Sequence, residues 1–176
     1  MVNISKTAQR MDIPAAGRYR IDVSRSSVAF RTRHMFGLGS VSGTMRVTSG
    51  EIILDPAVPQ VSIAATVDAA SFASGHKKRD SDVHKKFLQV ATYSEFTFRA
   101  AKLIEAQNLW TVTGQLTVCG VSQPVTLPIE SVEVTGQGFV ARATMRIDRY
   151  AFGVTAAKGM AARYLGVVLT VAAVPA

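Results

Sequence analysis

The residues that could carry out chemistry are few and widely spaced. His34, His76 and His84 do not have the spacing of a usual metal site, either with one another or with the single cysteine, Cys119. No histidine lies near Cys119 in the sequence to activate its thiol. No glycine-rich phosphate loop is present, because Gly37-Leu38-Gly39 has the composition of a turn. The sequence therefore predicts no metal site, no cofactor and no catalytic constellation.

Three polar side chains suit the recognition of a ligand's polar head group. His34 ends an expected strand, where it either donates a hydrogen bond to a bound ligand or has only a structural role. Arg79 either pairs with Asp80 or faces the head group. Arg149 either binds an anion or packs against Tyr150. His34, Arg79 and Arg149 are the candidate head-group residues, and both interpretations of each stay open.

The elements that must position these groups are strands, because apolar residues recur with a period of two. Trp110, Val112 and Leu116, for example, alternate with polar residues. Turn-forming residues separate such runs. The candidate strands cover 17–23, 27–34, 40–54 (with a possible break near Ser49-Gly50), 61–68, 93–103, 109–118, 124–134, 138–148 and 164–173.

One stretch departs from this period and predicts a helix. Val83 and Phe87 have helical spacing, and Asp80, Ser81 and Asp82 could cap a helix at about 81–89. The many strands predict a sandwich or a barrel, and a closed barrel leaves no strand edge exposed. We expect an all-β, up-and-down antiparallel barrel with one short helix over one end. It forms a single domain over 17–176, after a flexible arm at 1–16.

Sequential up-and-down strands place their connections alternately at the two ends of a barrel. The connections after His34 and at 69–92, 120–124 and 149–163 then share one end, while Ser24-Arg25, 55–60, 104–108 and 135–137 fall at the other. The first group is longer and carries the clustered basic residues, including Lys77, Lys78, Lys85 and Lys86. This pattern predicts one loop-rich, basic mouth, which either binds a ligand or is only a solvated face.

The composition narrows the class of partner. Of the 176 residues, 48% are hydrophobic and 18% charged, and the formal net charge of +8 favours anionic partners. Nucleic acid is disfavoured, because only 7% of residues are aromatic and no strand face interleaves them with basic residues. No run reaches the roughly 18 apolar residues of a membrane helix. No secretory leader is visible in residues 1–16, which together with the single cysteine favours a cytoplasmic location.

An ordered series of short segments resembles the YceI-like family of polyisoprenoid-binding, lipocalin-like barrels. The segments are 27–45, which contains Phe30, His34 and Gly43; Arg79-Asp80 with 93–98; 110–125; and Arg149 to Val154. The resemblance covers roughly 17–172. It implies an eight-stranded antiparallel barrel with a long lipid tail inside, so that the nine candidate strands overcount by one.

The alternation alone favours a filled core, whereas the resemblance favours a hollow one. An enclosed lipid tail would gain roughly 0.8 kcal/mol per buried CH₂. The candidate tail contacts are apolar residues expected to point inward or to lie at the mouth: Phe30, Phe36, Met45, Phe72, Phe87, Leu88, Phe96, Phe98, Val112, Leu116, Met145 and Phe152.

We therefore expect a protein that binds a long-chain polyisoprenoid lipid, of the isoprenoid-quinone or polyprenyl-phosphate type, as a carrier or store and not as an enzyme. Two alternatives stay open. One is an enzyme that acts on such a lipid, with His34 as acid or base. The other is a basic module that docks on an anionic membrane or nucleic acid through 76–86, with a packed barrel behind it. A homodimer is compatible with the sequence.

Overall fold

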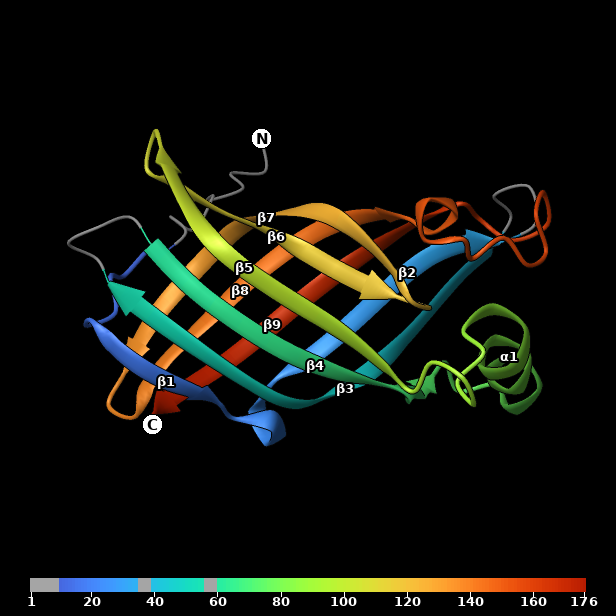
Figure 1. Ribbon diagram of the computed structural model, residues 1–176, viewed down its shortest axis with the longest axis horizontal. Helices are drawn as coiled ribbons and strands as arrows, with labels where there is room; N and C mark the ends of the chain where they lie inside the picture. The colour runs from blue at the N-terminus through green and yellow to red at the C-terminus, as the bar shows by residue number, and fades with distance from the viewer. Residues whose placement is uncertain (1–9, 35–38, 56–59) are drawn as a thin grey trace, which may run out of the picture.

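The computed structural model describes residues 10–34, 39–55 and 60–176, and over these residues the chain forms one closed antiparallel barrel (Figure 1). Each strand from β2 to β8 pairs with its successor, and β9 pairs with β2 to close the ring. The strands are β1 (Gly17–Ile21), β2 (Ser27–His34), β3 (Gly39–Asp55), β4 (Gln60–Ala73), β5 (Glu95–Ala106), β6 (Leu109–Val118), β7 (Val121–Thr135), β8 (Gly138–Asp148) and β9 (Tyr164–Pro175).

Strands β1 and β2 together occupy one position of the barrel wall. β1 pairs with residues 51–54 of β3 and 173–175 of β9, and β2 pairs with the other halves of the same two strands. The barrel therefore has eight positions, as predicted. Because β1 and β2 run in the same direction, the 3-10 turn η1 (Val23–Arg25) between them lies within the wall. The expectation that Ser24-Arg25 is a turn at the far end is wrong.

The helix over the mouth begins earlier than predicted. It consists of α1 (Lys77–Asp82) and a π-helical turn, η2 (Val83–Phe87). The cap is His76, whose Nδ1 accepts a hydrogen bond from the Arg79 N–H at 3.3 Å. The expectation of a cap among Asp80, Ser81 and Asp82 is therefore wrong. The Asp80 carboxylate instead accepts hydrogen bonds from the backbone N–H and hydroxyl of Ser74.

Two strands extend beyond their predicted ends towards the mouth. β4 continues to Ala73, and β7 begins at Val121 rather than near Pro124. The connection before β7 is a two-residue turn of Cys119 and Gly120, both with positive φ (49° and 75°). Such a turn joins strands that stay paired up to its edges, so Pro124 falls inside the strand and not in a loop.

Residues 10–16 of the expected arm lie against the barrel at the end away from the helix. Asp12 N–H donates to the Val132 carbonyl at 2.9 Å, and the Tyr19 hydroxyl donates to the Ala15 carbonyl at 2.7 Å. Pro14 is buried and lines the interior at this end. The chain thus covers the far end of the barrel before it enters β1.

Gly43 lies at a close approach between neighbouring strands in the mouth half of the wall. It lies opposite Phe30 in the β2–β3 ladder, and a Cβ at this position would collide with the Phe30 ring and the Ala73 carbonyl oxygen. We expect Gly43→Ala to lower the free energy of unfolding by about 1–3 kcal/mol, the usual cost of overpacking. A chemical denaturation curve measures this loss.

The matched control for this substitution is Gly136→Ala in a far-end turn. An added Cβ there meets no atom within 4 Å, and the residue is not among those with positive φ. It should leave stability within about 0.5 kcal/mol of the starting protein, as surface substitutions usually do. Equal losses in the two variants would contradict the close-packing explanation.

Candidate ligand-binding cavity

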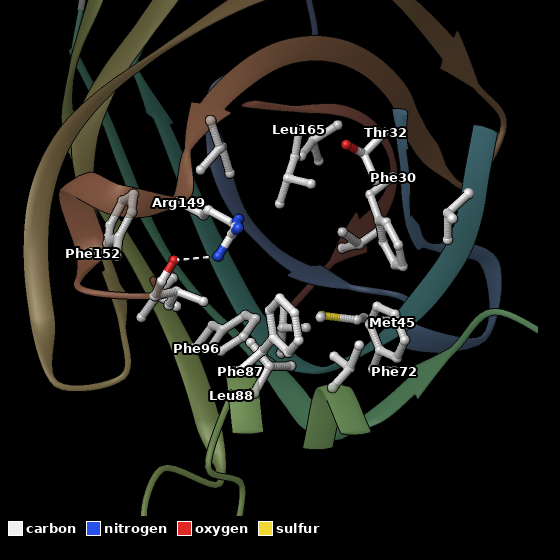
Figure 2. Close-up of a pocket in the computed structure, with 18 of the residues that line it drawn as sticks. Phe30, Thr32, Met45, Phe72, Phe87, Leu88, Phe96, Arg149, Phe152 and Leu165 are labelled. Carbon is white, nitrogen blue, oxygen red and sulfur yellow. Dashed lines mark hydrogen bonds between the residues drawn. The ribbon is translucent and has the colours of Figure 1, made fainter. Parts of the chain in front are cut away.

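The mouth half of the barrel encloses a cavity of about 420 Å³, within the range of about 300–1,000 Å³ typical of ligand pockets. Its lining is almost entirely apolar. Figure 2 shows Phe30 and Phe72 facing the space on one side, Phe87 and Leu88 below it and Leu165 above. The packed-barrel alternative would require a filled interior, and this half of the barrel is not filled.

The helix that follows β4 forms a lid on this cavity. Its residues Val83, Phe87 and Leu88 line the cavity. His84 Nε2 lies 3.0 Å from the carbonyl oxygen of Phe72, and the Cys119 thiol donates to the Leu88 carbonyl at 3.3 Å. Burial raises the pKa of the Cys119 thiol, which stays protonated and able to donate. The lid is thus tied to the end of β4 and to the β6–β7 turn.

A second, smaller cavity of about 140 Å³ continues the space into the far half of the barrel. An engineered apolar cavity of about 150 Å³ is large enough to bind benzene. Leu169 lines both cavities. Val28, Met145 and Leu169 each pack against the apolar clusters of both halves, and we call these three residues the waist. The waist separates a larger compartment at the mouth from a smaller one beyond it.

The wall at the mouth is incomplete between β7 and β8. Their ladder begins at the pair Ile129–Ala143, although both strands extend further towards the mouth. Pro124 and Pro128 lie in that part of β7 and have no N–H to donate to a ladder. The 3-10 turn η3 (Arg149–Phe152) packs there instead, and its Phe152, only 3% exposed, lines the cavity.

Arg149 is a buried cation on the cavity wall, 5% exposed (Figure 2). Its Nε donates to the Ala162 carbonyl at 2.8 Å, and Nη1 donates to those of Val154 and Ala156 at 2.7 and 2.9 Å. Nη2 donates to the Ala161 carbonyl at 3.1 Å. Burial lowers the pKa of Arg149, but a guanidinium stays charged near neutral pH. The charge is therefore balanced mainly by backbone dipoles of the β8–β9 connection.

Comparison with known proteins decides the family. The model of the YceI-like domain matches residues 19–173. This chain belongs to the YceI-like family. A UPF0312 protein of Vibrio parahaemolyticus is 31% identical over 122 residues, or 66% of this chain and 64% of that protein. Protein YceI of Salmonella arizonae is 30% identical over 127 residues, or 70% of this chain and 64% of that protein. The YceI-like chain thus matches just under two thirds of the length of these curated relatives.

Solved structures share the fold of this YceI-like barrel. The crystal structure of BcnA from Burkholderia cenocepacia matches with a TM-score of 0.77 and 26% identity, over 86% of this chain and 98% of that one. A polyisoprenoid-binding domain from Saccharophagus degradans matches with a TM-score of 0.65 and 13% identity, over 92% and 100%. The eight-stranded, lipocalin-like architecture expected from the sequence is confirmed.

The YceI-like barrel brings most of the predicted tail residues to the two cavities. The first cavity is lined by Phe30, Met45, Phe72, Phe87, Leu88, Phe96, Leu116, Met145 and Phe152, and the second by Phe98 and Val112. Phe36 lies outside the described residues. That these residues contact a ligand stays a prediction.

The predicted head-group residues have different placements. Arg79 and Arg149 both line the first cavity. The Arg79 Nε also donates to the Ser74 hydroxyl at 2.8 Å, so that Arg79 holds the start of the lid. His34 ends β2 opposite Gly39, but its side chain lies outside what the structure describes. A role for each in binding a head group stays a prediction.

Sequence reasoning missed the contribution of β9. Leu165, Val167 and Leu169 line the first cavity, and Leu169 and Val171 line the second. Their strict alternation was visible in the sequence and could have identified them. Within the described ranges, no three residues among His, Cys, Asp and Glu are grouped to hold a metal ion. In the same ranges, no helix combines the length and apolarity needed to cross a bilayer.

Proposed function

We propose that the protein binds a long-chain polyisoprenoid lipid, with the tail inside the barrel and the head group at the mouth, as a carrier or store. The observation that carries the proposal is the pair of apolar cavities that follow one another through the barrel. A protein of the same fold is described as a polyisoprenoid-binding domain, and this supports the choice of ligand class.

The shape of the interior suits a long, thin tail better than a compact ligand. The inward residues of β9 run from Leu165 to Val171, about 20 Å along the strand at roughly 3.3 Å per residue. A tail that passed the waist would fill both compartments. At roughly 0.8 kcal/mol per buried CH₂, each further carbon of the tail strengthens binding. Phenylalanine and methionine side chains on the wall can adjust to the methyl branches of a prenyl chain.

The polar end of the ligand would lie beside the cations of the mouth cavity. Arg149 uses four of its five N–H groups on backbone carbonyls, which leaves one N–H for an acceptor on the ligand. Arg79 lines the same cavity from the lid. A phosphate or a quinone oxygen would accept hydrogen bonds from either guanidinium. His34 remains a third candidate donor at this end.

Native mass spectrometry and organic extraction of the purified protein test the proposal. We expect a bound lipid whose fragments repeat at the mass of an isoprene unit. The single tryptophan, Trp110, lines the second cavity and provides a second measurement. Its emission should change when a long prenyl lipid is added, because the tail would lie against the indole. Protein that carries no lipid and shows no response to any prenyl lipid would overturn the proposal.

A further inference from the structure

The charge of the barrel is concentrated at one end. Apart from the buried Arg149, the two long connections at the mouth, 74–94 and 149–163, carry seven lysines and arginines against two aspartates. The described connections between strands at the opposite end, 107–108 and 136–137, contain no charged residue. Because both long connections lie at the same end (Figure 1), the positive charge faces one direction. A surface of opposite charge would therefore orient the barrel mouth-first.

The lid presents part of this charge away from the barrel. Lys77, Lys78, Lys85 and Lys86 are exposed, while Val83, Phe87 and Leu88 line the cavity on the lid's inner side. Lys86 also pairs with Asp82 at 3.0 Å, but both side chains are largely solvated. We call the four lysines the basic face of the lid. It is free of the contacts that fix the lid to the barrel.

The β8–β9 connection contributes a second patch, which is partly apolar. Met160 is 67% exposed and Tyr164 is 42% exposed, and the exposed cations Lys158 and Arg163 lie near them in the sequence. The Arg163 guanidinium lies 5.2 Å from the centre of the Tyr164 ring. We call Lys158, Met160, Arg163 and Tyr164 the Met160 patch. An uncovered methionine among cations and a tyrosine is typical of a segment that sits at a lipid–water interface.

We propose that the mouth of the barrel docks on the surface of an anionic lipid bilayer through the basic face of the lid and the Met160 patch. Each lysine or arginine near an anionic membrane strengthens binding about fivefold. The exposed Met160 favours a bilayer over an acidic protein or a nucleic acid, because only the bilayer offers it an apolar environment. The cavity lies at this same end, so a docked barrel could exchange a tail with the bilayer; this purpose rests on the proposed lipid binding, whereas the docking itself does not.

Co-sedimentation with vesicles tests the docking. We compare vesicles of phosphatidylcholine alone with vesicles that also contain phosphatidylglycerol. We expect binding only to the anionic vesicles, weakening as salt is raised. Lys85→Gln/Lys86→Gln should weaken this binding about 30-fold, from two lost cations. The control, Arg20→Gln/Lys102→Gln, removes two exposed cations from the far half of the wall and should change binding less than twofold.

The Met160 patch is tested by Met160→Ser against Val168→Ser, which changes an apolar side chain, 47% exposed, on the barrel wall. Met160→Ser should lower the binding that persists at high salt, and Val168→Ser should not. Equal binding to neutral and anionic vesicles, or equal losses in the two charge variants, would overturn the proposal. So would binding to duplex DNA that depends on Lys85 and Lys86 without any binding to vesicles.

The docking and the proposed lipid binding can fail separately. A Lys85→Gln/Lys86→Gln protein that still carries its bound lipid but no longer binds vesicles supports both. Protein that binds anionic vesicles but carries no prenyl lipid and takes none up retains the docking and refutes the lipid binding. Protein that carries a lipid but does not bind anionic vesicles refutes the docking and retains the lipid binding.

Discussion

Leu169→Trp is expected to remove the affinity that long prenyl lipids gain over shorter ones, while the shorter ones bind as before. Leu169 lines both cavities at the waist, and an indole there would obstruct a tail that runs from one cavity into the other. A tail confined to the first cavity leaves its remaining isoprene units in water. Each unit has about five carbons, so its exclusion costs about 4 kcal/mol, or roughly a thousandfold in affinity.

Isothermal titration with prenyl phosphates of increasing length measures this effect. In the starting protein, affinity should rise with length until both cavities are filled. In Leu169→Trp it should stop rising at a shorter tail. Val168→Trp is the control, because Val168 is the adjacent residue of β9, is 47% exposed and points outwards. If the two variants show the same dependence on length, the tail does not pass the waist.

The sequence predicted the parts of this fold that depend on local patterns. Alternation identified each strand, and parity placed the long connections at one end, where the lid and η3 lie. The shared position of β1 and β2 could not be predicted in this way, because it depends on which halves of β3 and β9 each strand pairs with. The family resemblance supplied the count of eight.

The errors at the lid have a physical cause. Asp80 is a preferred capping residue type, yet in the fold its carboxylate is used by Ser74, six residues earlier. His76, a less usual cap, takes the position instead. The sequence alone could not show that the interior is hollow, because inward apolar residues have the same pattern whether they pack against one another or line a cavity. The waist arises from residues of β2, β8 and β9 that only the closed barrel brings together.

The buried guanidinium of Arg149 gives the second large effect, since Arg149→Lys should unfold the β8–β9 connection locally and destabilise the protein. An ammonium can donate at most three hydrogen bonds from a single point, whereas the guanidinium reaches four carbonyls from three nitrogens. Each buried carbonyl left without a donor costs about 1–3 kcal/mol. We expect a loss of about 2–4 kcal/mol in the free energy of unfolding, and faster hydrogen exchange in 154–163.

Arg163→Lys is the matched control, because it makes the same chemical change in the same connection at a solvated position. The Arg163 side chain is 50% exposed, and its Nη2 lies 2.6 Å from the Oδ2 of Asp148. The hydrogen bond from Arg163 lowers the pKa of the Asp148 carboxyl. Exposed pairs contribute about 0–1 kcal/mol, so this variant should stay within about 1 kcal/mol of the starting protein. Equal stability of the two variants would mean that water replaces the guanidinium at the four carbonyls. The difference in the free energy of unfolding between the two variants measures what the four hydrogen bonds of the buried Arg149 contribute.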